Sequence, residues 1–162
     1  MSNILCVYHS RTGKTRQAMT AIAEELDAEL VELTDGLDRQ GKLKVVPACF
    51  DAVRKSTRPL EPFRTARPIT EYDLVIIGTP IWAGRCSPVI REFLKKYGSD
   101  LRWSAYVLTR SSHQRYEEVC RQMDQYTAAP HLQWVSLQVG EAGEAFWRAE
   151  FIRQLRGIVY AG

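Results

Sequence analysis

The sequence has no apolar run approaching the roughly 20 residues that a membrane-spanning helix needs. Its amino terminus enters an apolar stretch without the charged-then-apolar pattern of a secretion signal. Its cysteines, Cys6, Cys49, Cys86 and Cys120, are scattered, and no two of them stand at metal-binding spacing. Because such usage suits a reducing compartment better than a disulfide framework, we expect a cytoplasmic protein with no membrane span and no metal site.

An excess of either charge is also lacking, since 22 Lys and Arg residues face 19 Asp and Glu residues and leave a formal net charge of +3. Basic residues nevertheless gather between positions 39 and 67. This segment is interpreted either as a positive rim for an anionic cofactor or substrate, or as a solvated surface loop. It has no aromatic interleaving and no recognisable nucleic-acid module, so we expect no nucleic-acid partner.

What the sequence does contain is a regular alternation of strand-like and helix-like segments. Apolar, strand-forming stretches predict strands at residues 4–8, 29–33, 74–77, 103–108 and 132–137. Helical periodicity follows each of them, at residues 18–26, 45–55, 88–97, 116–123 and 146–159. This alternation within 162 residues implies one α/β domain, residues 1–162, whose parallel sheet is covered by helices on both faces.

The turn after the first predicted strand combines three hydroxyl side chains with a glycine, at Ser10, Thr12, Gly13 and Thr15. At this place the first backbone N–H groups of the following helix have no internal partners, and the helix dipole is positive. A phosphate is a natural ligand there, because hydroxyls can donate to its oxygens and a glycine allows close approach of the backbone. The simpler alternative is that Ser10 or Thr12 only caps the helix.

Two other kinds of phosphate site fit the turn less well. The run Gly13-Lys14-Thr15 suggests a nucleoside triphosphatase, but Tyr8 stands where that motif needs its first glycine. The third strand also runs into Gly78 rather than into a magnesium-binding aspartate. A cysteine phosphatase built on Cys6 would need arginine at position 12, where the sequence has threonine.

Two motifs, in this order along the chain, resemble the flavodoxin family. The turn matches that family's phosphate-binding pattern S/T-x-T-G-x-T at Ser10, Thr12, Gly13 and Thr15. Residues 72–84 look like the family's third strand and the flavin-contacting loop after it, and a predicted helix then follows. The resemblance implies a flavodoxin-like three-layer sandwich with a five-stranded parallel sheet in the order 2-1-3-4-5, and FMN as the cofactor.

The resemblance places FMN in the crevice formed by the loops after strands one, three and four. The turn would hold its phosphate, and the two later loops would flank its ring. In the first of these loops, Trp82 could stack on the ring, with a core position as the alternative. The second loop lacks the family's glycines, so Arg110, Ser111 and Ser112 could donate hydrogen bonds instead. The expected FMN-binding residues are Ser10, Arg11, Thr12, Gly13, Lys14, Thr15, Thr79, Pro80, Ile81, Trp82, Ala83, Gly84, Thr109, Arg110, Ser111 and Ser112.

Five further residues carry chemistry that the pattern leaves open. Arg85 could place a cation beside the flavin's pyrimidine edge or lie on the surface. Cys86 is a redox-thiol hypothesis without a resolving partner, so burial is its simpler role. His113 is a weak candidate for a catalytic proton donor, against an exposed capping role. Structural roles are expected for His131 and Trp134.

The resemblance implies FMN-dependent electron transfer, and two classes of function remain open within it. One is an oxidoreductase that passes electrons from NAD(P)H to a quinone-like small molecule, and the other is a flavodoxin-type carrier that serves a redox partner. The family's mobile carriers are typically acidic, whereas this chain has a net charge of +3, which favours the enzyme. A flavodoxin-like domain that has lost FMN is a third interpretation, and a homodimer is left open.

Overall fold

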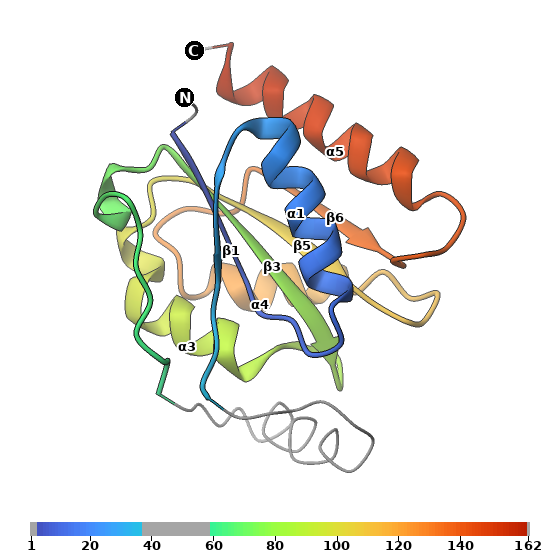
Figure 1. Ribbon diagram of the computed structural model, residues 1–162, viewed down its shortest axis with the longest axis horizontal. Coiled ribbons are helices and arrows are strands. Elements are labelled where there is room, and N and C mark those ends of the chain that lie inside the picture. The colour runs from blue at the N-terminus through green and yellow to red at the C-terminus, as the bar shows by residue number, and fades with distance from the viewer. Residues whose placement is uncertain (1–2, 37–58, 162) are drawn as a thin grey trace.

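A parallel sheet runs through the centre of the protein, in a computed structural model that describes residues 3–36 and 59–161 (Figure 1). The parallel strands are β1 (Ile4–Tyr8), β2 (Glu29–Glu32), β3 (Leu74–Trp82), β5 (Ser104–Thr109) and β6 (Gln133–Leu137). They lie in the order β2-β1-β3-β5-β6, which confirms the predicted sheet and its order. The helix expected at residues 45–55, and most of the basic segment, lie outside the described residues.

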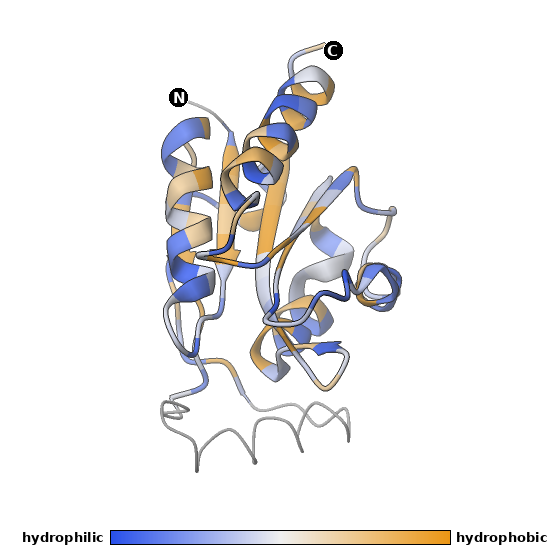
Figure 2. Cartoon of the chain, turned by 90° about the vertical axis from the view of Figure 1, so that its right-hand side faces the viewer, coloured by the Kyte–Doolittle hydropathy of each residue, from blue (hydrophilic) through white to orange (hydrophobic). Residues whose placement is uncertain are grey.

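Two pairs of helices cover the sheet and make the expected three layers. On one face lie α1 (Lys14–Leu26) and α5 (Glu144–Val159), and on the other lie α3 (Pro88–Tyr97) and α4 (Glu117–Asp124). Side chains alternate between the faces along each strand, so Cys6 packs towards α1 while its neighbours Leu5 and Val7 pack on the opposite face. Figure 2 shows these apolar strands in orange between helices that turn their hydrophilic faces outward.

The covered sheet accounts for most of the folding free energy. Each large apolar side chain that it buries contributes about 1.5–3 kcal/mol. Two short 3-10 helices, η1 (Ile69–Glu71) and η2 (Gly98–Asp100), complete the connections on either side of β3 and α3. Within the described part of the chain, no helix combines the length and the apolar character that a membrane crossing requires.

The third strand is where the sequence-based prediction is wrong. It was expected to end at Ile77, with a loop over residues 79–84, but β3 continues to Trp82. Its end pairs antiparallel with the short strand β4 (Arg85–Cys86). The two residues between them, Ala83 and Gly84, both have positive φ, at 50° and 70°, as the tight turn of a hairpin requires. The predicted flavin loop is therefore a β-hairpin. The sequence predicted a loop because Pro80 and Gly84 are residue types that rarely occur inside strands.

A polar cluster beneath β5 joins the end of α4 to the segment that enters β6. The hydroxyl of the fully buried Tyr106 donates to Asp124 Oδ1 over 2.8 Å. Asp124 also accepts from the backbone N–H of His131, and its Oδ2 lies 2.8 Å from Nδ1 of the same histidine. Burial raises the pKa of Tyr106 well above its ordinary value, so its hydroxyl remains a donor. His131 thus has the structural partner that the sequence could not name.

Replacing Asp124 by alanine should destabilise the protein by about 2–3 kcal/mol, because the buried Tyr106 hydroxyl would lose its acceptor. Urea unfolding followed by far-UV circular dichroism measures this. The matched control is Glu117→Ala, since Glu117 is an exposed carboxylate on the same helix and should cost no more than about 0.5 kcal/mol. Adding Tyr106→Phe to Asp124→Ala should cost less than the two changes summed, and strict additivity would contradict the proposed coupling.

Candidate functional site

Three connections meet at the carboxyl edge of the sheet, where the chain leaves β1, β3 and β5. The chain passes from β1 to β2 on one side of it and then crosses to β3 on the other side. The strand order therefore reverses at β1, and this edge is the switch point of the sheet. A cleft of about 420 Å³ opens here. It is lined by Arg11, Thr12, Lys14, Thr15, Pro80, Ile81, Trp82, Ala83, Thr109, Arg110 and Ser111. Every one of these residues belongs to the set expected from the sequence.

The turn after β1 is closed by its own serine. Ser10 Oγ accepts hydrogen bonds from the backbone N–H groups of Gly13, over 3.0 Å, and Arg16, over 3.3 Å. Gly13 has a φ of 93°, a left-handed conformation that glycine adopts without strain. Ser10 Oγ therefore satisfies the N–H of Arg16 in the first turn of α1, although Gly13 is the N-cap residue, and its hydroxyl hydrogen is left to donate to a ligand.

This turn leaves several backbone donors free at the amino end of α1. The N–H groups of Arg11, Thr12, Lys14 and Thr15 have no hydrogen-bond acceptor within residues 3–36 and 59–161. They lie at the positive end of the dipole of a 13-residue helix. The combination of free amides and helix dipole makes the turn a site for an anion.

The side chain of Arg11 strengthens this conclusion. Its Nε is buried and has no hydrogen-bond partner in the described structure. A buried donor left unsatisfied costs about 1–3 kcal/mol, so a ligand that supplies an acceptor there recovers that cost. A phosphate has three acceptor oxygens and at least one negative charge, and it matches both Arg11 and the free amides of the turn.

Thr15 has a different partner from the one expected. Its Oγ1 lies 2.7 Å from Oγ1 of Thr109, and both side chains are buried. Because one of the two hydroxyls must donate to the other, only one hydrogen of the pair remains for a ligand. The contact ties the first loop of the cleft to the third, which sets the width of the cleft between them.

The β3–β4 hairpin forms the middle wall of the cleft. Trp82 lines the cleft although only 6 % of its surface is exposed, and its ring meets that of His9 edge-on, with centroids 5.5 Å apart. Trp82 is thus both a core residue and a wall residue. Nothing in the sequence singles out His9, whose contact with Trp82 comes from the pairing of β1 with β3.

Thr79 does not line the cleft. It is fully buried, where its hydroxyl accepts from the backbone N–H of Ser87 and donates to the carbonyl of Pro80. This corrects its expected role from ligand contact to bracing of the hairpin. Gly84 likewise shapes the hairpin turn rather than lining the cleft, and Arg85 faces a separate cavity of about 190 Å³.

The third loop is held onto β6 by side chains instead of presenting glycine amides. Arg110 donates from Nε to Ser136 Oγ over 2.8 Å and from Nη1 to the carbonyl of Ser112 over 2.5 Å. Burial, together with the nearby positive charge of Arg115, lowers the pKa of Arg110. Ser112 itself lies outside the cleft, as does the exposed His113, so the structure gives no support to a catalytic role for that histidine.

Among the described residues, the charged side chains that line the cleft are all cations: Arg11, Lys14 and Arg110. No described carboxylate lines it, and none of the three cations forms an ion pair within residues 3–36 and 59–161. Uncompensated positive charges attract anions, so the charges of the cleft and the free amides of the turn favour the same kind of ligand.

The described cysteines take no part in this site. Cys6, Cys86 and Cys120 are buried thiols, and none lines the cleft. Burial raises the pKa of Cys86 to about 11, so at neutral pH it is a thiol rather than a reactive thiolate. Cys86 therefore has the buried position that the sequence analysis treated as its simpler role, while Cys49 lies outside the described residues.

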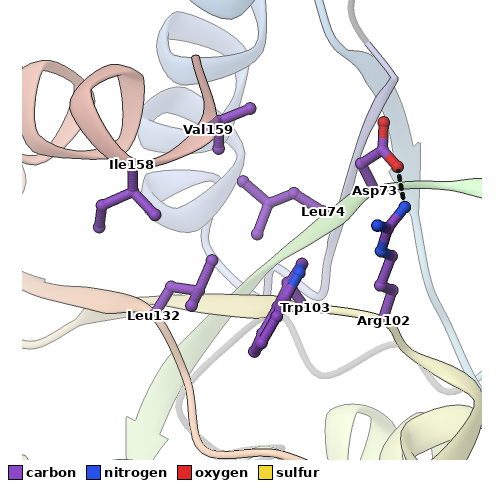
Figure 3. Close-up of a pocket in the computed structure, with 7 residues that line it drawn as sticks. All are labelled: Asp73, Leu74, Arg102, Trp103, Leu132, Ile158 and Val159. Carbon is purple, nitrogen blue, oxygen red and sulfur yellow. Dashed lines mark hydrogen bonds and ion pairs between the residues drawn. The ribbon is translucent and has the colours of Figure 1, made fainter. Parts of the chain in front are cut away.

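A larger cavity, of about 500 Å³, lies at the opposite, amino-terminal edge of the sheet (Figure 3). Leu74, Trp103, Leu132 and Ile158 point towards one another around it. Its charged residues neutralise each other, since Arg102 donates to Asp73 over 2.8 Å. Its lining is otherwise mostly apolar, so the smaller cationic cleft is the candidate functional site.

Comparison with solved structures agrees with this geometry. A flavoprotein from Lactobacillus acidophilus, solved in complex with FMN, has 18% sequence identity and a TM-score of 0.69. The match covers 91% of this chain and 99% of the flavoprotein chain. A protein from Bacteroides eggerthii has 16% identity and a TM-score of 0.75, with 99% of both chains covered. A WrbA-like flavodoxin from Agrobacterium tumefaciens has 14% identity and a TM-score of 0.54, over 97% of this chain and 99% of its own.

The chain has a flavodoxin-like fold. No protein-family model matches the sequence, and no curated protein matches it either. At such low identities the likeness establishes the arrangement of the elements, whereas the chemistry of the cleft must be argued from its own residues.

Gly13→Ala should destabilise the protein by about 1–2 kcal/mol, because a residue with a Cβ is strained at a φ of 93°. No atom lies within 4 Å of the Cβ that would be added, so only backbone strain is being measured. Gly157→Ala is the matched control, since Gly157 lies inside α5 with equally open space around it. That change should stabilise the protein by about 0.5–1 kcal/mol in the same urea titration, and a loss of stability for both variants would contradict the account of the turn.

Proposed function

We propose that this chain binds FMN in the cationic cleft and serves in electron transfer, as a nicotinamide-dependent reductase of a quinone-like acceptor. The observation that carries the proposal is the turn after β1. Its free backbone amides and the buried Nε of Arg11 are unpaired donors within the described residues, and Trp82 lines the same cleft. The flavin would supply the redox chemistry, and the protein would bind it, orient it and set the charge around it.

The phosphate would be held by the turn. The backbone N–H groups of Arg11, Thr12, Lys14 and Thr15 can donate to it, as can the hydroxyl of Thr12, which has no partner among the described residues. Hydrogen bonds to an ionised oxygen are about twice as strong as those between neutral groups. The cations Arg11 and Lys14 would balance its charge.

The ring would lie between the two later loops. The hairpin offers the apolar side chains of Ile81, Trp82 and Ala83 as one wall, and the loop from Thr109 to Ser111 offers the other. An apolar wall excludes water from the ring, while Arg110 would place a fixed positive charge beside it. The hydrogen bonds from Arg110 to Ser136 and Ser112 hold that charge in place.

The charge of the cleft favours the reductase over a mobile carrier. A carrier that docks onto basic redox partners needs an acidic surface around its cofactor, whereas the described charged residues of this cleft are all cations. Cations around the ring instead suit small anionic or electron-poor substrates, which an enzyme must admit to the cofactor.

Thr12→Val should weaken FMN binding about 10- to 150-fold, because it removes a donor to the charged phosphate worth about 1.5–3 kcal/mol. The side chain is exposed and makes no internal hydrogen bond, so the fold should be unaffected. Ser112→Ala is the control and should change the affinity less than twofold, because Ser112 does not line the cleft. Quenching of flavin fluorescence on titration measures both.

The same titration, preceded by a visible spectrum after gel filtration, decides whether the protein binds FMN at all. A flavin spectrum that travels with the protein supports the proposal. Wild-type protein that stays colourless after incubation with FMN would instead favour a flavodoxin-like domain that has lost the cofactor. Equal affinities of wild type and Thr12→Val would remove the phosphate assignment.

The FMN-loaded protein should oxidise NADPH steadily when menadione, a simple quinone, is present. Absorbance at the nicotinamide band measures the rate. Loss of activity should follow the loss of FMN affinity in Thr12→Val and should be relieved by excess FMN. Retention of FMN without NADPH or NADH oxidation by several acceptors would contradict the reductase and leave the carrier.

A further inference from the structure

One arginine beside the cleft is held in place without being neutralised. The Cζ atom of Arg115 lies 5.1 Å from the ring centroid of Trp134, on β6, and 5.5 Å from that of Trp147, near the start of α5. No carboxylate among the described residues forms an ion pair with Arg115. The two indoles therefore orient its guanidinium and leave its charge available.

A second unneutralised guanidinium is held on the same face of β6. Arg110, which lines the cleft, donates to Ser136, and Arg115 lies over Trp134; these two β6 residues stand two positions apart, so their side chains share one face of the strand. In agreement with this placement, the charge of Arg115 is one of the causes that lower the pKa of Arg110. The hydrogen bonds of Arg110 use Nε and Nη1, so the two N–H groups of Nη2 have no acceptor in the described structure. The partners of both guanidiniums are neutral groups, so their two positive charges repel each other, and a bound anion would stabilise the pair.

Exposed aromatic surface adjoins Arg115. Trp147 and Phe146 are 48 % and 63 % exposed, and their rings meet edge-on with centroids 5.1 Å apart. They belong to the first turn of α5, which starts shortly after the end of β6 and close to the edge of the sheet where β5 leads into the Arg110 loop (Figure 1). A single exposed aromatic residue needs no explanation, but two beside a pair of free guanidiniums form a combined surface.

We propose that Arg110, Arg115, Trp147 and Phe146 form a binding site for aromatic anions, which carries the second substrate to the cleft. The guanidiniums pair with a sulfonate, carboxylate or phosphate group, and the exposed rings pack against the flat part of the same molecule. As a statement about substrate this rests on the proposed function, but the site itself is complete without FMN. Its chemistry is shared by the nucleotide part of a nicotinamide dinucleotide and by a quinone that bears an acidic group.

Binding of two probe pairs to the full chain, measured by calorimetry and by NMR shifts of the indole N–H groups, tests the site. The first pair is naphthalene-2-sulfonate against neutral 2-naphthalenemethanol, and the second is adenosine 5′-monophosphate against adenosine. The charged member of at least one pair should bind about tenfold more tightly than its neutral partner, and its affinity should fall as salt is raised. A larger difference for the naphthalene pair indicates a site for an acidic quinone, whereas a larger difference for the adenosine pair indicates a site for a nucleotide.

Arg115→Ala should weaken binding of the charged probe about tenfold or more, and Trp147→Leu should weaken it while moving the shift of the Trp134 indole. Arg153→Ala is the matched control, because Arg153 is an exposed arginine on α5 that pairs with Glu150. It should leave the affinity unchanged within twofold. Equal affinities for charged and neutral probes, or for wild type and Arg115→Ala, would overturn the proposal.

The affinity of Arg115→Ala for FMN separates this inference from the proposed function. It should equal that of the wild type within about twofold, because Arg115 does not line the cleft. Failure of the chain to bind FMN, with probe binding still dependent on Arg115, would remove the flavin function and leave the anion site standing. Binding of FMN with no charge-dependent probe binding would do the reverse.

Discussion

The free backbone amides at the start of α1 are the constraint on which the candidate site depends. A helix cannot satisfy its first N–H groups internally, and here Ser10 takes up those of Gly13 and Arg16 while the others remain available. The left-handed Gly13 makes the turn tight enough for these donors to gather at one point. The buried Nε of Arg11 adds a cationic donor to the same turn, and it has no hydrogen-bond partner within the described residues.

The rest of the cleft follows from how the sheet brings two further loops to that turn. The contact between Thr15 and Thr109 joins the first loop to the third, and the pairing of β1 with β3 sets His9 against Trp82. Positive charge continues from the turn to Arg110 and then, outside the cleft, to Arg115. None of the side chains of Arg11, Lys14, Arg110 and Arg115 forms an ion pair within the described residues.

Much of the fold could be predicted because its signals are local. The alternation of apolar strands with helical periodicity specified a covered parallel sheet, and the bounds of β1 were right to the residue. The hydroxyls and the glycine of the proposed phosphate turn could also be picked out, since they stand within six residues of one another. By contrast, the extension of β3 to Trp82 was missed, because Thr79-Pro80 reads as a loop until β4 and β5 pair with it.

The sequence by itself determined the order of the elements, the composition of the turn and the three loops that had to meet. Only the tertiary structure decided what each side chain does there. It placed Thr79 behind the hairpin, turned Thr15 towards Thr109, fastened Arg110 to Ser136 and set Arg115 between two indoles. The physical reason is that a hydrogen bond or a ring contact between residues far apart in the chain depends on strand register and packing. Neither can be predicted from the identity of one residue and its sequence neighbours.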